Sequence, residues 1–258
     1  MITKQRLISD FQDIGINPNG TLLVHSSMKA IGDVEGGADT VLDALSEFMS
    51  EGLLLLPTHS WDKHNLANGI YDPKTEPSCV GILGEMFRQR EGVLRSLHPT
   101  HSMAALGKNA EQFIAGEETL TSPCPRHGAW GKLYDVDAQI LFLGCPLTRN
   151  TYIHGVEEWS AIPNRIDSES EAITIIKGDE AIETILRRHK SPFGSIHENY
   201  DKLERPFVKQ GIGHWGTIGE ARSFLASAKG MADLVQAFLK RNQDVFLYDE
   251  PIPESWYE

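Results

Sequence analysis

A short segment of the sequence places a histidine and a carboxylate at a spacing that could support proton transfer. His154 precedes Glu157 by three residues, and Thr151 lies three residues before His154. On a helical turn, residues three apart share one face, so the carboxylate could orient the imidazole or bind a cationic substrate beside it. An imidazole is the natural general base at neutral pH. An exposed pair with no function has the same spacing, so both interpretations stay open on these residues alone.

A second segment carries two histidines and a hydroxyl group on a predicted loop over residues 94–102. His98 and His101 are three residues apart, and Ser102 follows directly. Two imidazoles could hold a metal ion, but a metal site needs further ligands, and no HExxH pattern supplies them. Alternatively, these side chains hydrogen-bond a ligand or the backbone.

A third segment combines hydroxyl groups, glycines and a cation. Ser26 and Ser27 follow a predicted strand, Lys29 comes next, and Gly36 and Gly37 precede a predicted helix. Backbone N–H groups at such a helix start can bind an anion, and ligands of open α/β sheets bind at this edge. The alternative is a glycine-rich connection with a capping serine. Neither a P-loop nor a GxGxxG pattern is present.

A fourth segment, residues 122–133, contains Ser122 and Cys124 but no GxSxG pattern. A free cysteine is more often a small buried apolar side chain than a nucleophile. Covalent catalysis is therefore not favoured.

An alternating pattern of strands and helices must position these segments. Apolar runs predict strands over 21–25 and 53–57, and the helical periodicity between them, over 38–49, predicts a parallel βαβ unit. We also predict strands over 139–144 and 245–248, a hairpin over 172–177 and 181–188, and helices over 3–14, 80–89, 218–228 and 234–239. The polar stretch 58–77 reads as a long loop, a kind of segment that is often functional.

The fold class that follows is α/β. We expect a mixed, largely parallel central sheet flanked by helices, with a β-hairpin elaboration in the C-terminal half. No composition break or linker divides the chain, so residues 1–258 are expected to form a single domain.

The composition excludes several classes of function. The chain has 24 Lys and Arg against 36 Asp and Glu, which gives a net charge of −12. This acidity argues against nucleic acid as a partner and is compatible with a cationic small molecule. Three scattered cysteines make no disulfide framework, and apolar runs no longer than the four residues of Leu53–Leu56 are far too short to span a membrane. The N-terminus lacks the apolar stretch of a signal peptide, so we expect a cytoplasmic protein.

Five segments in order along the chain resemble the aminoglycoside 3-N-acetyltransferase family, whose fold is unrelated to that of the GNAT acetyltransferases. The segments are LLVHSSMKAIGDVEGGADTVLDAL at 22–45, LLLPTHS at 54–60, LRSLHPTHSMAALG at 94–107, LFLGCPLTRNTYIHGVEE at 141–158 and GTIGEARSFLASAKGMADLV at 216–235. The resemblance implies an N-acetyltransferase that uses acetyl-CoA in a ternary complex and needs no metal.

The resemblance also implies roles for individual residues. His154 would be the general base, Glu157 would orient it or bind the acceptor, and Thr151 would help to stabilise the oxyanion. The residues implied for coenzyme A binding are Ser26, Ser27, Lys29, Ala30, Gly36 and Gly37, together with His98 and Ser102 facing the same cleft.

His59 and Asp62 follow the second predicted strand at its carboxyl edge, so they are candidate contacts for the acceptor. Loops 58–77 and 167–205 are expected to shape the acceptor pocket.

Several alternatives for function remain open at this point. The cationic amine acceptor could be an aminoglycoside or a different amine. The chain could also be a non-catalytic protein that binds a polycation, or a metal-dependent hydrolase that uses His98 and His101. We expect no nucleic-acid or membrane partner, and a monomer or a homodimer.

Overall fold

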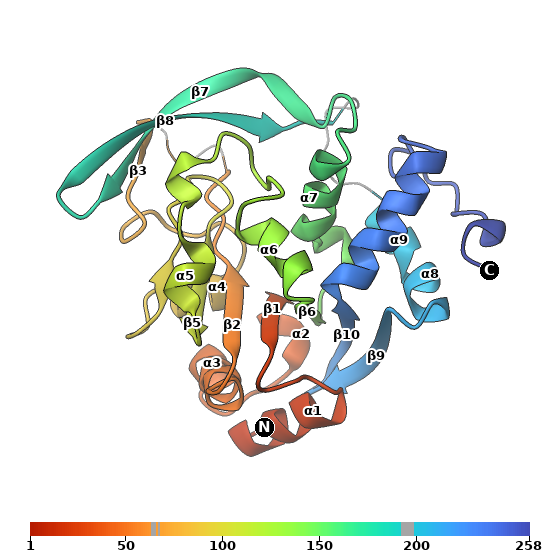
Figure 1. Cartoon of the computed structure of the whole chain (residues 1–258). Coiled ribbons are helices and arrows are strands. Elements are labelled where there is room, and N and C mark those ends of the chain that lie inside the picture. Colours follow the sequence, from red (N-terminus) through yellow and green to blue (C-terminus); the bar gives the residue numbers. More distant parts are fainter. Residues whose placement is uncertain (63–65, 67, 192–198) are drawn as a thin grey trace.

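A seven-stranded mixed sheet forms the centre of the molecule, with strand order β4-β5-β2-β1-β6-β10-β9 (Figure 1). The computed structural model describes residues 1–62, 66, 68–191 and 199–258. The strands of this sheet are β1 (Thr21–Ser26), β2 (Leu53–Pro57), β4 (Leu94–Arg95), β5 (Met103–Gly107), β6 (Gln139–Leu143), β9 (Gly213–Ile218) and β10 (Ala221–Ser227). The helices are α1 (Lys4–Asp13), α2 (Met28–Ile31), α3 (Gly37–Phe48), α4 (Ile82–Phe87), α5 (Ala110–Ile114), α6 (Ala129–Asp135), α7 (Thr151–Trp159), α8 (Glu204–Lys209) and α9 (Ala228–Arg241). Short 3₁₀ turns are η1 (Glu117–Thr119), η2 (Leu147–Arg149), η3 (Tyr200–Leu203) and η4 (Glu254–Trp256).

The predicted βαβ unit is confirmed. β1 and β2 pair in parallel, with Thr21 opposite Leu53, and α3 connects them. β6 pairs in parallel with the other edge of β1. Both faces of these three strands are covered, which explains why their sequences are nearly continuous apolar runs.

The mixed α/β class is also confirmed, but the parallel part of the sheet is limited to β2, β1 and β6. The four outer pairings, β2–β5, β5–β4, β6–β10 and β10–β9, are antiparallel. Strand β5 was not expected, since its alanines and glycine give a weak strand signal.

Two local predictions are wrong. The stretch 218–228 is not a helix: Gly219 and Glu220 form a tight turn between β9 and β10. β10 is buried on both faces, so its apolar spacing imitates a helical period. Residues 245–248 form no strand, although Val245 and Phe246 are buried in the core as their apolar character requires.

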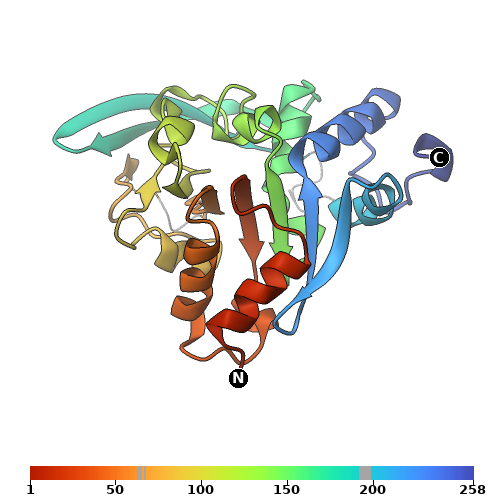
Figure 2. The same cartoon turned by 60° about the horizontal axis from the view of Figure 1, so that its bottom comes forward.

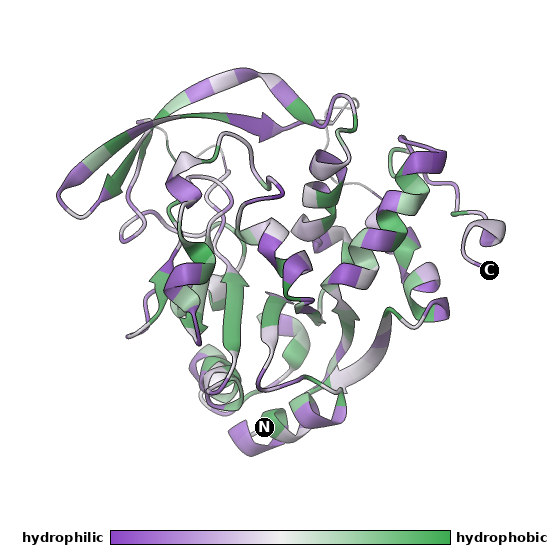
Figure 3. Cartoon of the chain, viewed as in Figure 1, coloured by the Kyte–Doolittle hydropathy of each residue, from purple (hydrophilic) through white to green (hydrophobic). Residues whose placement is uncertain are grey.

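Two apolar cores lie on opposite faces of the sheet. Alternate residues of β1 divide between them, with Leu23 in one core and Leu22 and Val24 in the other. Helices α1, α3 and α4 cover one face, and α5, α6, α7 and α9 cover the other (Figures 1 and 2). The apolar colouring of the central strands in Figure 3 follows from this arrangement.

A second sheet of three strands carries the predicted hairpin. Strands β7 (Ile166–Lys177) and β8 (Glu180–His189) are longer than expected, and the short β3 (Ile70–Tyr71) pairs with the outer edge of β7. The far end of the hairpin extends beyond the helices in Figure 1. Its apolar residues, Tyr71, Ile173, Ile175 and Leu186, form a small cluster of their own.

Across the part of the chain that the structure describes, none of the helices has both the length and the apolar character needed to cross a bilayer.

Candidate active site

A cavity of about 680 Å³ opens at the carboxyl ends of the three parallel strands. Its wall includes Ser26 at the end of β1, Pro57 at the end of β2 and Gly144 after β6. Parallel strands bring their carboxyl ends to the same edge, which is where open α/β sheets bind ligands. The histidines, hydroxyl groups and cations discussed below meet in this cavity.

Helix α7 delivers His154 to the cavity. Tyr152, Ile153 and Val156 are fully buried in the core and fix the rotation of the helix. This rotation places Thr151 and His154, one turn apart, in the cavity wall. The side chain of His154 is 16% exposed.

The hydroxyl of Tyr200 joins His154 to Glu157. Tyr200 Oη lies 2.8 Å from His154 Nδ1 and donates to Glu157 Oε2 at 2.6 Å, whereas His154 Nδ1 and Glu157 Oε2 are 3.8 Å apart. Glu157 thus acts on His154 mainly through the tyrosine. Its other oxygen accepts a 2.8 Å bond from Arg165 Nε, so the charge of this buried carboxylate is balanced.

This chain of hydrogen bonds fixes the tautomer of the imidazole. Because Tyr200 donates its single proton to Glu157, its oxygen accepts the proton on His154 Nδ1. The unprotonated nitrogen of neutral His154 is then Nε2, the form that a general base requires.

Other histidines surround His154. The His189 ring lies 5.1 Å from the His154 ring and 5.0 Å from the His101 ring, measured between centroids. His189 Nε2 is 3.6 Å from Glu158 Oε2, which also accepts the Cys124 N–H. A second histidine–carboxylate pair therefore borders the same cavity.

His59 contacts Thr151 inside the cavity wall. His59 Nε2 lies 3.1 Å from Thr151 Oγ1, and the His59 side chain packs against the rings of His101 and Trp130. Burial lowers the pKa of His59 well below its usual value, so its ring is neutral at pH 7. Asp62, the other candidate acceptor contact, is not among the lining residues, although its neighbour Trp61 is.

The residues expected to bind coenzyme A divide into two groups. Ser26, Ser27 and Lys29 line the cavity. Ala30 instead lies behind Gly144, and Gly36 and Gly37 form the start of α3 outside the cavity. A second cation, Arg149, lines the cavity as well.

The His98 and Ser102 side chains are fully buried behind the cavity wall and do not line it. His98 Nδ1 accepts from the backbone N–H groups of Thr100 and His101, and its Nε2 bonds the Ser122 carbonyl oxygen. Burial lowers the pKa of His98 to about 4. The two residues hold the loop in shape, and His101 is the member of the segment that reaches the cavity.

The described residues include no group of three or more His, Cys, Asp or Glu side chains arranged to hold a metal ion. Cys124 is buried and burial raises the pKa of its thiol well above the usual value, which agrees with a packing role.

Sequence reasoning missed Tyr200, His189 and Arg149. Tyr200 lies 46 residues from His154, and His189 ends a strand of the hairpin, so only the folded chain brings them to the site. Arg149 lies within the segment 141–158 and was visible as a cation two residues before Thr151.

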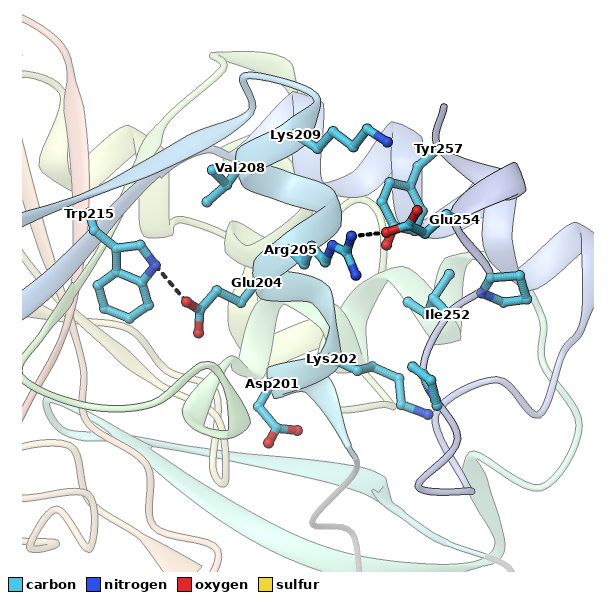
Figure 4. A pocket seen from close by; sticks show the side chains of 12 residues that line it. Asp201, Lys202, Glu204, Arg205, Val208, Lys209, Trp215, Ile252, Glu254 and Tyr257 are labelled. Atoms are coloured by element: carbon cyan, nitrogen blue, oxygen red, sulfur yellow. Dashed lines mark hydrogen bonds and ion pairs between the residues drawn. The ribbon is translucent and has the colours of Figure 1, made fainter.

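A second hollow, of about 890 Å³, lies between α8 and the C-terminal residues (Figure 4). Some of its charged groups are engaged with neighbours: Trp215 Nε1 donates to Glu204 Oε1 at 2.8 Å, and Arg205 pairs with Glu254. None of the predicted site residues lines it. The cavity at the sheet edge is therefore the candidate active site.

Comparison with known proteins gives one consistent result. The family model described as aminoglycoside 3-N-acetyltransferase matches residues 23–240. Aminoglycoside N(3)-acetyltransferase IV of a Salmonella species is 32% identical over 95% of this chain and 90% of its own length.

Solved structures agree. A histidine-to-alanine variant of aminoglycoside acetyltransferase AAC(3)-IVa in complex with a gentamicin is 25% identical and superposes with a TM-score of 0.82 over 99% of this chain and 94% of that chain. AAC-IIIb, in a binary complex with CoASH, shares the fold at 23% identity, with a TM-score of 0.81 over 97% of this chain and 99% of that chain. With the family model matching most of the sequence, the chain belongs to the aminoglycoside 3-N-acetyltransferase family.

Proposed function

We propose that this protein transfers the acetyl group of acetyl-CoA to an amino group of an aminoglycoside, with His154 as general base. The observation that carries the proposal is the hydrogen-bonded series His154–Tyr200–Glu157 beside the cavity at the sheet edge. The names of the relatives, which are aminoglycoside N(3)-acetyltransferases, support the same reaction and cofactor.

The residues supply each requirement of the reaction. An acceptor amine is mostly ammonium at neutral pH and must lose a proton before it can attack. His154 Nε2 takes this proton, and the amine nitrogen bonds to the thioester carbon. The C–S bond then breaks, and the second proton that the nitrogen loses goes to the thiolate, so coenzyme A leaves as the thiol. The Tyr200–Glu157 pair stabilises the imidazolium that forms. The Thr151 hydroxyl lines the cavity one helical turn from His154 and can donate to the developing oxyanion.

Lys29 and Arg149 are suited to the phosphates of coenzyme A. Both side chains are exposed and line the cavity, and neither takes part in an ion pair among the described residues. We assign Ser26 and Ser27, at the carboxyl end of β1, to the same cofactor.

One observation favours a second candidate, in which the cofactor and chemistry are the same but the acceptor is an amine with fewer positive charges. The described residues that line the cavity include Lys29 and Arg149 but no carboxylate, because Glu157 and Glu158 lie behind His154 and His189. A polycation is best bound by several exposed carboxylates.

A thiol-release assay separates these candidates. Acetyl-CoA is offered with gentamicin, kanamycin, apramycin and, as a second group, monoamines and amino acids. Release that depends on the aminoglycosides supports the first candidate, and release with the second group alone supports the other. No release with any amine contradicts both.

The variant His154→Ala tests the base. We expect turnover to fall by at least about 10²-fold, which is the usual contribution of a general base, while coenzyme A still binds in a calorimetric titration. His127→Ala, which removes an exposed imidazole away from the cavity, is the matched control. Near-normal turnover of His154→Ala would show that the base is another group.

A further inference from the structure

The contact between His59 and Thr151 lies directly beside the candidate base. His59 follows β2 and is only 2% exposed, enclosed by the rings of His101 and Trp130. Its Nε2 is 3.1 Å from Thr151 Oγ1, and no other hydrogen-bond partner of this hydroxyl occurs among the described residues. The direction of this hydrogen bond decides which way the threonine proton points.

The surroundings of the ring decide which nitrogen carries its proton. His59 is neutral at pH 7 because burial disfavours its charged form, so one ring nitrogen is protonated and the other is not. Nδ1 is buried and has no hydrogen-bond partner in the described part of the chain. A proton on Nδ1 would leave a buried donor unsatisfied, which native structures tolerate less often than an unused acceptor. The favoured tautomer therefore carries its proton on Nε2.

This tautomer sets the polarity of the hydrogen bond. Nε2–H donates to Thr151 Oγ1, so the threonine oxygen is the acceptor and its own proton must point elsewhere. Thr151 lines the cavity on the same helix face as His154, one turn away. The free direction for the O–H group is therefore the space in which the base works.

We propose that His59 is a positioning residue that turns the Thr151 hydroxyl proton into the cavity, where it donates to the carbonyl oxygen of the acetyl thioester. The hydrogen bond strengthens as the carbonyl oxygen gains negative charge during attack by the amine. With the opposite tautomer, Thr151 would donate to His59 and could not serve the oxyanion. This inference rests on the proposed acetyl transfer.

Steady-state kinetics of four variants test the proposal. His59→Phe keeps a ring against His101 and Trp130 but removes the donor, and His59→Gln restores an N–H donor. We expect kcat of His59→Phe to fall by about tenfold with the KM for acetyl-CoA unchanged, and His59→Gln to recover most of the loss. Thr151→Val should lose about 10²-fold in kcat. The double variant His59→Phe, Thr151→Val should be no slower than Thr151→Val, because His59 acts only through that hydroxyl.

Several outcomes would overturn the proposal. The first is a kcat of His59→Phe equal to that of the wild type. The second is an equal loss of kcat in His59→Phe and His59→Gln. The third is a loss of kcat in the double variant that equals the product of the two single losses. If the wild-type protein released no thiol, that result would count against the proposed function. The tautomer of His59 would then be tested by a direct measurement.

That measurement is ¹⁵N NMR of the wild-type histidine rings at pH 7, which needs no activity and no variant that might fail to fold. A protonated Nε2 and an unprotonated Nδ1 on His59 are expected. The reverse assignment would contradict the proposal even if the enzyme is active.

Discussion

At the residue scale, the hydroxyl of Tyr200 links the candidate base His154 to the carboxylate of Glu157. Tyr200→Phe removes this hydroxyl but keeps the ring packed on Phe246. We expect kcat to fall by about tenfold, since His154 loses the partner that fixes its tautomer and Glu157 loses a donor. Steady-state thiol release measures the effect. Tyr134→Phe, which removes a surface hydroxyl bonded to Asp233, is the control and should be unchanged; a normal Tyr200→Phe rate would place the orienting contact elsewhere.

The two cavity cations lead to a second prediction. Under the proposed assignment of these cations to the phosphates of coenzyme A, Lys29→Ala and Arg149→Ala should each remove a charge-assisted bond. Each variant should raise the KM for acetyl-CoA by about tenfold and leave kcat within about twofold. Acetyl-pantetheine lacks the phosphates, so its kinetics should not respond to either substitution. Lys240→Ala, an exposed lysine outside the cavity, is the control. Equal effects on both thioesters would show that the cations act on another group.

At this scale, the sequence indicated pairs of site residues that are close together in the chain, but not partners that are far apart in it. His154 and Glu157 are neighbours on one helix, so their spacing was informative, whereas Tyr200 joins them from a different segment. The segment containing His98 and Ser102 was recognisable, but not which of its side chains would face the cavity. The direction in which these side chains point depends on contacts in the folded loop. Backbone N–H groups donate to His98 Nδ1, and Ser102 is buried against Thr58.

At the scale of elements, the link from β6 to the 3₁₀ turn before α7 depends on Gly144. Its φ is +67°, and a Cβ there would lie 2.5 Å from Ala30 Cβ. We expect Gly144→Ala to lower the free energy of unfolding by about 3 kcal/mol, from backbone strain plus overpacking. Coenzyme A should also bind more weakly, since Ala30 lies on α2, the helix that directly follows Ser26 and Ser27.

A matched control separates strain from overpacking. Gly178, in the hairpin turn, has a similar φ of +64° with no atom within 4 Å of a Cβ. Gly178→Ala should cost only about 1 kcal/mol, with no effect on coenzyme A binding. Urea unfolding of both variants gives the comparison, and equal losses would contradict the role of the Ala30 contact.

The sequence predicted well the elements with a one-sided helical pattern or a short uninterrupted apolar run. Helix α3 and strands β1, β2 and β6 lie close to their expected bounds. β10 is also buried on both faces, but Arg222 and Ser223 interrupt its apolar run, so the spacing of its apolar residues imitates a helical period. The places of the outer strands in the sheet could not be predicted from the sequence. Packing in the folded chain, rather than the length of the connecting segments, decides which strand each of them pairs with.

At the scale of the whole molecule, four buried histidines make stability sensitive to acid. Burial lowers the pKa of His25 to about 3 and that of His98 to about 4, and it lowers the pKa of His59 and His101 well below 6.5. Below pH 6.5 the unfolded chain binds protons that the folded chain does not, so stability is present above this pH and is lost as the pH falls.

Each such histidine contributes a slope of at most about 1.4 kcal/mol per pH unit, so the four together contribute about 5 kcal/mol per pH unit. Glu117 acts in the opposite sense, since burial raises its pKa to about 7 and the folded chain holds an extra proton between pH 4.5 and 7. We therefore expect a net slope of about 4 kcal/mol per pH unit between pH 6 and 5. Urea unfolding at pH 7.5, 6.0, 5.5 and 5.0 measures this slope, and a free energy of unfolding that does not change over this range would contradict the prediction.

The hairpin β7–β8 has a consequence for how enzymes of this shape can diversify. Its apolar residues form a cluster separate from the two cores that hold the sheet, so most of the hairpin can change in length or sequence without disturbing them. Yet its last residue, His189, borders the cavity beside His154. Under the proposed function, the hairpin beside the acceptor can change during evolution while the proton-transfer groups on α7 stay in place. A new range of acceptors can then arise with little loss of stability.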